Sequence, residues 1–216
     1  MLSIVKSMSL EGLSGYLVDI QIDVSGGLPS FEIVGLPDIR VKEAKERVRT
    51  AIKNSGVEFP SRKIVINLAP ADKRKEGTFF DLPIAVGILK ALEEIDCLEL
   101  EDSIFLGELS LNGKINRING ILPMCIEAIS LGIKKVVIPK ENLIEASIIK
   151  GLEIIPVENL KQVIEYFRGE TKIEVQNVNQ ENINFDSQNG YNLDFSEVKG
   201  QENAKRALEI AAAGRT

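Results

Sequence analysis

Hydrophobic and polar residues alternate near the start of the chain. Residues 15–25 place five apolar side chains on one face of an extended chain: Tyr16, Val18, Ile20, Ile22 and Val24. The residues between them include Asp19, Gln21 and Asp23, so the pattern predicts a strand with one face toward the core and one toward water. Residues 7–15 and 30–37 are further strand candidates, and we expect the chain to open with short antiparallel strands.

The hydrophobic period changes to that of a helix between residues 37 and 56. Four apolar residues recur there every three or four positions: Val41, Ala44, Val48 and Ile52. Asp38 can cap the start of this helix and Gly56 suits its end. The segment therefore predicts an amphipathic helix packed on the early strands.

Strands and helices then alternate up to Gly169. Strands are predicted over residues 62–70, 103–115, 134–139 and 152–157. Helices are predicted over residues 81–95, 121–132, 141–149 and 159–169. Early antiparallel strands followed by alternating strands and helices indicate an α+β fold, with one domain over residues 1–169.

The composition shifts after residue 169. Nine of the 17 residues from Gln176 to Asn192 are Asn or Gln, too polar to form a core, so we expect a linker over residues 170–192. A helical pattern returns in residues 193–216, where a second, truncated domain is expected to begin.

Charge and hydropathy narrow the class of protein. The 216-residue chain is 44% hydrophobic, and none of its apolar runs reaches the roughly 18 residues of a membrane span. No secretory signal begins the sequence, so a cytoplasmic protein without membrane contact is expected. The net charge of −6 argues against a generally cationic nucleic-acid-binding domain, although a local basic patch is compatible with it.

Histidine is absent from the sequence, which excludes mechanisms that need it. Ser-His-Asp and Cys-His catalysis and the usual zinc ligation are ruled out, so no metal site is predicted. The two cysteines, Cys97 and Cys125, have no metal-ligand spacing and are expected to be reduced thiols. A complete phosphate-binding loop, Gly-x4-Gly-Lys-Ser/Thr, is also absent, so no cofactor is expected within these residues.

The stretch KRKEGTFFDLPIA, residues 73–85, admits two interpretations. As an active site, it would use Thr78 as nucleophile and Lys75 as base. As a structural turn, it would use Asp81 to cap the following helix, with Pro83 in the first helical turn and the phenylalanines anchoring the loop. We favour the structural turn, because one helix cap explains both Asp81 and Pro83.

Basic residues gather in two places and are candidate contacts for DNA or a protein partner. The loop contributes Lys73, Arg74 and Lys75. The helix over residues 38–54 contributes Arg40, Lys42, Lys45, Arg47, Arg49 and Lys53, against only Glu43 and Glu46. If the loop and the helix adjoin, they form a basic surface on an otherwise acidic protein.

Two motifs carry a resemblance to a known family. The segments Gly35-Leu36-Pro37 and Phe80-Asp81-Leu82-Pro83, within residues 30–89, closely resemble the N-terminal domain of ComM/YifB proteins, which are AAA+ ATPases also called magnesium-chelatase-like or ChlI-type. The resemblance implies a parent protein that uses ATP and Mg²⁺, assembles as a hexamer and acts as a DNA helicase in branch migration during natural transformation. Residues 194–214 resemble the entry to the ATPase module, and Val198 and Gly200 match a segment near adenine.

The same domain is distantly similar to the proteolytic domain of Lon, which implies a Lon-like fold of the ribosomal-protein-S5-domain-2 type. Lon acts through a Ser-Lys dyad. Phe79 and Leu122 stand at the approximate positions of that serine and lysine, so the resemblance implies an inactive relative that is not itself an enzyme. Two alternatives stay open: a Lon-related peptidase with a rearranged Thr78 and Lys75 site, and a subunit for metal insertion into a porphyrin.

Overall fold

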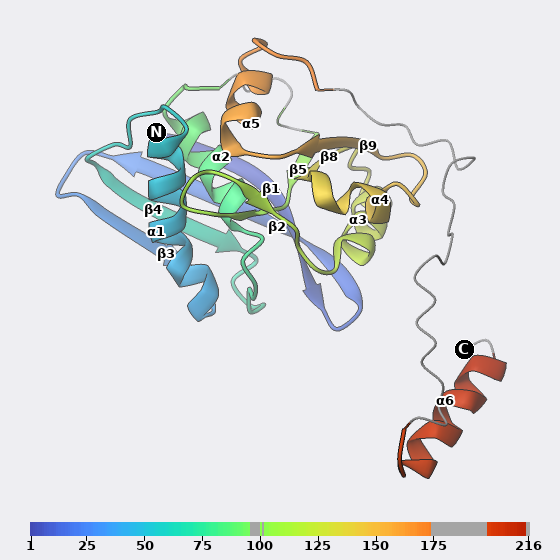
Figure 1. Cartoon of the computed structure of the whole chain (residues 1–216). Coiled ribbons are helices and arrows are strands. Elements are labelled where there is room, and N and C mark those ends of the chain that lie inside the picture. Colours follow the sequence, from blue (N-terminus) through green and yellow to red (C-terminus); the bar gives the residue numbers. More distant parts are fainter. Residues whose placement is uncertain (96–99, 101, 174–197, 215–216) are drawn as a thin grey trace. The chain divides into compact units, whose positions relative to one another are not determined.

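The computed structural model describes residues 1–95, 100, 102–173 and 198–214 (Figure 1). Backbone contacts divide the chain into two units, Met1–Gln180 and Glu181–Thr216. The first unit contains a seven-stranded mixed sheet with helices, which confirms the predicted α+β class. Of the helices in the described ranges, none is both long enough and apolar enough to cross a membrane.

The sheet has the strand order β3-β4-β2-β1-β5-β8-β9. Strands β1 (Leu2–Glu11) and β2 (Ser14–Ser25) form an antiparallel hairpin, and β4 (Lys63–Ala69) pairs antiparallel with β2. These early strands are antiparallel as expected, but β3 (Ser30–Val34) is parallel to β4. The difference arises because a helix connects β3 to β4 and returns the chain to the same end of the sheet.

The connecting helix, α1 (Ile39–Asn54), has the predicted caps. The Asp38 carboxylate accepts a hydrogen bond from the Val41 amide at 2.8 Å, and the chain leaves the helix through Gly56 at a φ of +91°. The four apolar residues that predicted this helix are all buried. In Figure 1, α1 lies against the sheet near β3 and β4.

The second half of the unit extends the sheet with parallel strands. These are β5 (Ser103–Phe105), β8 (Lys135–Pro139) and β9 (Glu153–Val157). The chain between these strands forms β6 (Glu108–Leu109), β7 (Ile115–Asn116), α3 (Ile121–Ser130), η1 (Lys140–Asn142) and α4 (Leu143–Ala146). Helix α5 (Leu160–Phe167) follows β9. The single strand predicted over residues 103–115 is therefore three short strands, and the helix predicted over residues 141–149 is two short ones.

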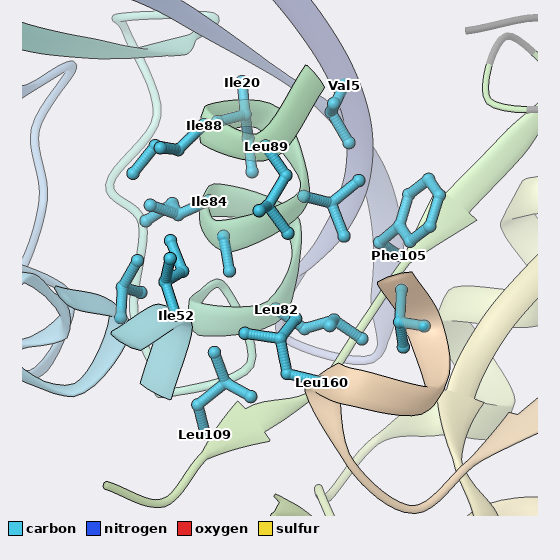
Figure 2. Close-up of a cluster of buried hydrophobic side chains, with 14 of the residues drawn as sticks. Val5, Ile20, Ile52, Leu82, Ile84, Ile88, Leu89, Phe105, Leu109 and Leu160 are labelled. Atoms are coloured by element: carbon cyan, nitrogen blue, oxygen red, sulfur yellow. The ribbon is translucent and has the colours of Figure 1, made fainter. Parts of the chain in front are cut away.

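The main hydrophobic core surrounds α2 (Asp81–Ala91), in which every residue except Lys90 is buried. Figure 2 shows the core side chains around this helix, among them Ile20 of the sheet and Ile52 of α1. A second apolar cluster lies between the sheet and α3 and includes Met8, Met124 and Val136. Because α2 is buried all round, its first residue, Asp81, is buried as well.

The second unit contains α6 (Glu202–Gly214), which has no buried residue. Most of the linker predicted over residues 170–192 lies outside the described residues, as does Cys97. Cys125 is a free, buried thiol, and burial raises its pKa to about 12. The thiol is therefore protonated at neutral pH and a poor nucleophile.

Candidate functional site

The basic loop predicted as a DNA contact contains one buried residue, Lys75. Its side chain is fully buried, and its ammonium donates to the Lys73 carbonyl at 2.7 Å and to the Pro70 carbonyl. Burial lowers the pKa of Lys75. The prediction of Lys75 as a surface contact is therefore wrong, because its charge holds the turn of its own loop.

The backbone of Lys75 also joins this loop to the segment before α1. The Lys75 amide donates to the Leu36 carbonyl at 3.1 Å, and the Asp38 amide donates to the Lys75 carbonyl at 2.9 Å. Pro37 and Lys75 consequently form a parallel bridge. The loop thus adjoins the start of the basic helix, which is the condition for the two to share one basic surface.

Lys73 and Arg74 lie at the surface, each beside a carboxylate. Lys73 contacts Glu11 at 2.7 Å and lies 4.6 Å from the centre of the Tyr16 ring, and the hydrogen bond to Glu11 raises the pKa of Lys73. Arg74 lies 3.2 Å from Glu76. Contact of Lys73 and Arg74 with DNA stays a prediction.

Arg40 and Arg47, the two helix residues chosen as contacts, differ in their surroundings. Arg40 is exposed and donates to the Asp38 carboxylate at 3.0 Å, so its role in DNA contact stays a prediction. Arg47 instead makes two hydrogen bonds to the Asp81 carboxylate, at 2.6 and 3.0 Å. The Arg47 guanidinium thus completes an ion pair with a buried carboxylate while its side chain stays partly exposed, and its contact with DNA stays a prediction.

Asp81 does not cap α2 as predicted. Helix α2 begins at Asp81 itself, after Phe80, and no side chain accepts a hydrogen bond from its first amides. The Asp81 carboxylate accepts instead from Arg47 and, at 3.2 Å, from the Leu109 amide. Burial raises the pKa of Asp81 to about 6, although the Arg47 guanidinium and the Leu109 amide act in the opposite direction.

A polar cleft of about 320 Å³ borders the segment that precedes α2. Its lining includes Arg40, Thr78, Phe79, Glu108 and Arg117. The Thr78 hydroxyl donates to the Glu108 carboxylate, and the Phe79 ring packs against Phe80 with centroids 4.7 Å apart. The cleft thus contains a threonine hydroxyl, but this hydroxyl is paired with an acid rather than with a base.

The two positions matched to the Lon dyad have apolar side chains. Phe79 is half-buried and packs with both hydrophobic clusters. Leu122 is half-buried in the first turn of α3, and its backbone amide donates to the Glu145 carboxylate at 3.4 Å. Neither side chain can take or supply a proton, so neither can act as a catalytic nucleophile or base. That they occupy the positions of the Lon dyad stays a prediction.

A larger hollow of about 760 Å³ was not predicted from the sequence. It lies near the end of α1 and the start of α5, and its lining includes Asn54, Lys114 and Lys140. Lys114 pairs with Glu141 at 3.2 Å and Lys140 with Glu158 at 2.5 Å. The charges in the hollow come from segments far apart in the sequence, so no local pattern signals it.

The remaining predicted site is a nucleotide site in the second unit. Val198 and Gly200 are described at the start of the second unit, Gly200 with a φ of +69°, and their proximity to adenine stays a prediction. Across the described ranges, no three potential metal ligands of the His, Cys, Asp or Glu type lie together.

Comparison with known proteins identifies the relatives of this chain. A family model described as subunit ChlI of Mg-chelatase matches residues 20–142, which is more than half of the chain. The competence protein ComM of Haemophilus influenzae is 39% identical over 215 residues, covering 99% of this chain and 42% of ComM. YifB of Escherichia coli is 38% identical over 213 residues, covering 99% of this chain and 41% of YifB.

The chain thus spans about two-fifths of the length of these curated relatives. Lon protease 2 of Bacillus subtilis is a weaker match, 28% identical over 183 residues, covering 75% of this chain and 32% of the protease. These findings confirm the resemblances that the two sequence motifs suggested. The chain belongs to the family described as subunit ChlI of Mg-chelatase, and within it is similar to ComM and YifB over nearly its whole length.

Proposed function

We propose that this chain is the non-catalytic N-terminal part of a ComM-type AAA+ ATPase that acts on DNA in the cytoplasm. The parent protein would hydrolyse ATP with Mg²⁺, assemble as a hexamer and drive branch migration during recombination in natural transformation. The first unit would guide DNA or support ring assembly. Similarity to the competence protein ComM over 99% of the chain supports this proposal.

One structural observation supports the non-catalytic role. The two groups that a rearranged protease site would need, Thr78 and Lys75, are each engaged elsewhere: the hydroxyl with Glu108 and the ammonium with two backbone carbonyls. Because the Lys75 amine already donates to two backbone carbonyls and the Thr78 hydroxyl donates to a carboxylate, the two groups do not form a nucleophile and base pair. We therefore expect no peptidase activity.

A casein assay tests the non-catalytic role. Purified chain incubated with unfolded casein is expected to leave it intact, and Thr78→Ala is expected to behave in the same way. Cleavage that Thr78→Ala abolishes would establish a peptidase and overturn this part of the proposal.

The ATPase part of the proposal has a separate test. The coding sequence after Thr216 is expected to contain Gly-x4-Gly-Lys-Ser/Thr within about 30 residues, since a phosphate-binding loop requires that pattern. Val198 and Gly200 would then lie near the adenine of the bound nucleotide. The full-length protein is expected to hydrolyse ATP faster with DNA present and to move a four-way DNA junction. Absence of both activities would overturn the proposal.

A further inference from the structure

Helix α1 carries a row of cations on its outer side. Lys42, Lys45, Arg49 and Lys53 follow one another at intervals of three or four residues, so they line a single stripe of the helix. We call these four residues the α1 stripe. Its ends are eleven positions apart in the sequence, which corresponds to about 16 Å along the helix axis.

The cations of the α1 stripe have no acidic partner within the described part of the chain. Lys42, Arg49 and Lys53 are exposed, and Lys45 is half-buried. Three other surface cations differ: Lys73, Arg74 and Lys140 each lie within 3.2 Å of a carboxylate. A cation that is already paired gains less from a phosphate, because it must first give up its carboxylate.

The stripe is also positioned by its surroundings. Arg49 lies over the Phe59 ring, 5.7 Å from its centre, and Phe59 stacks on Phe31 of β3. This contact holds the guanidinium on the α1 surface without neutralising its charge. Glu46 is the one acid of α1 beside the stripe, since Glu43 lies 3.9 Å from Arg47.

We propose that the α1 stripe binds the phosphate backbone of duplex DNA. The inference rests on the proposed function, because it names the surface through which the first unit would guide DNA. Helix α1 contains six cations and two acids, a local excess of four positive charges on a chain of net charge −6. Duplex DNA carries one phosphate per roughly 1.7 Å of axis, a higher charge density than that of a single strand. A straight row of cations therefore fits duplex DNA better than single-stranded DNA.

The test is binding of the 216-residue chain to a labelled duplex, measured by fluorescence anisotropy at several salt concentrations. The triple variant Lys42→Gln, Lys45→Gln, Lys53→Gln is expected to bind at least tenfold more weakly at low salt. Its slope of log affinity against log salt is expected to fall by about 2.7, since each lost phosphate contact removes about 0.9.

The matched control removes three lysines elsewhere: Lys134→Gln, Lys140→Gln, Lys161→Gln. These lysines are exposed and each lies within 4.0 Å of a carboxylate, so the control has the same net charge as the triple variant. It is expected to change the affinity less than threefold. In the opposite direction, Glu46→Gln is expected to strengthen binding severalfold, a gain that a folding defect cannot produce.

Three results would overturn the inference. The unmodified chain could fail to bind the duplex, or the two triple variants could lose the same affinity. The third result is that neither Glu46→Gln nor the stripe triple variant changes the affinity for the duplex. These results leave the proposed function standing if the full-length protein still shows DNA-dependent ATP hydrolysis. Conversely, stripe-dependent DNA binding without that hydrolysis would overturn the proposed function and support the α1 stripe.

Discussion

Two basic regions of this molecule look alike in sequence and differ in structure. The loop at Lys73–Lys75 packs three cations together, yet Lys75 is buried and the other two lie beside carboxylates. The α1 stripe spreads its cations over residues 42–53 and leaves them without acidic partners among the described residues. Density of charge along the sequence therefore says little about which charges a ligand can reach.

The comparison extends to the neighbours of each region. Arg47 and Arg49 are two residues apart on α1, and the helix turns one inward to Asp81 and the other outward over Phe59. The same residue type thus serves stability at one position and leaves a free charge at the other. Substitutions in the two regions should separate stability from binding.

The largest effect is expected for Arg47→Met. The variant leaves the Asp81 carboxylate buried without its partner, and such a loss destabilises a protein by about 3–5 kcal/mol. Urea unfolding at pH 7 would measure the free energy of unfolding. Arg49→Met, the matched change on the exposed side, is expected to lower it by less than about 1 kcal/mol. Equal losses in the two variants would show that the ion pair between Arg47 and Asp81 does not contribute more to the free energy of unfolding than the exposed Arg49.

A double variant sharpens this result. Arg47→Met with Asp81→Leu replaces both charges by apolar groups, and such replacements are often neutral or stabilising. We expect the double variant to recover most of the stability lost in Arg47→Met. A loss as large as that of the single variant would mean that the Leu109 amide, rather than the unpaired charge, determines the effect.

The pH dependence of Arg47→Met is the second prediction. Asp81 already has a pKa raised to about 6 by burial, and removing the guanidinium raises it further. A carboxyl with a raised folded-state pKa contributes stability below its unfolded pKa, near 4, and loses it as the pH rises through the folded value. The stability gap between wild type and Arg47→Met should therefore be smallest near pH 4 and largest above pH 7. Urea unfolding across this range would measure the gap, and a gap independent of pH would contradict the assignment.

The sequence predicts features that depend on neighbouring residues. Helix α1 was predicted correctly because its apolar period, the Asp38 cap and the Gly56 exit all lie within 20 residues. The turn at Asn112-Gly113, which interrupts the strand predicted over residues 103–115, also depends on neighbouring residues, since the Ser110 amide donates to the Lys114 carbonyl across it.

Features that depend on distant partners were missed. An aspartate two residues before a proline fits both a helix cap and the first helical residue. The partners that distinguish the two are distant: Arg47 is 34 positions earlier and Leu109 is 28 positions later. Lys75 is likewise indistinguishable from its basic neighbours, since its burial follows from the pairing of its backbone with Leu36 and Asp38. The parallel pairing of β3 depends on where α1 returns the chain, which a strand pattern does not encode.

The third prediction concerns the buried lysine of the loop. Lys75→Met keeps the aliphatic stem but removes the donor to the Pro70 and Lys73 carbonyls, and hydrogen bonds of charged donors contribute about 1.5–3 kcal/mol. We expect a loss of about 2 kcal/mol in the free energy of unfolding. Lys73→Met, two residues away and at the surface, is expected to change it by less than about 1 kcal/mol. Equal effects of the two variants would contradict a special role for Lys75.

The smallest effect on stability is expected in the α1 stripe, which is where binding should change most. Exposed residues without partners contribute within about 0.5 kcal/mol each. Replacing Lys42, Lys45 and Lys53 with glutamine also removes repulsion between cations three and four residues apart, so the free energy of unfolding should stay constant or rise slightly. Thermal and urea unfolding would measure it beside the anisotropy assay. If the triple variant loses both stability and DNA affinity, the α1 stripe has a structural role like that of the loop. The contrast between the two basic regions would then be wrong.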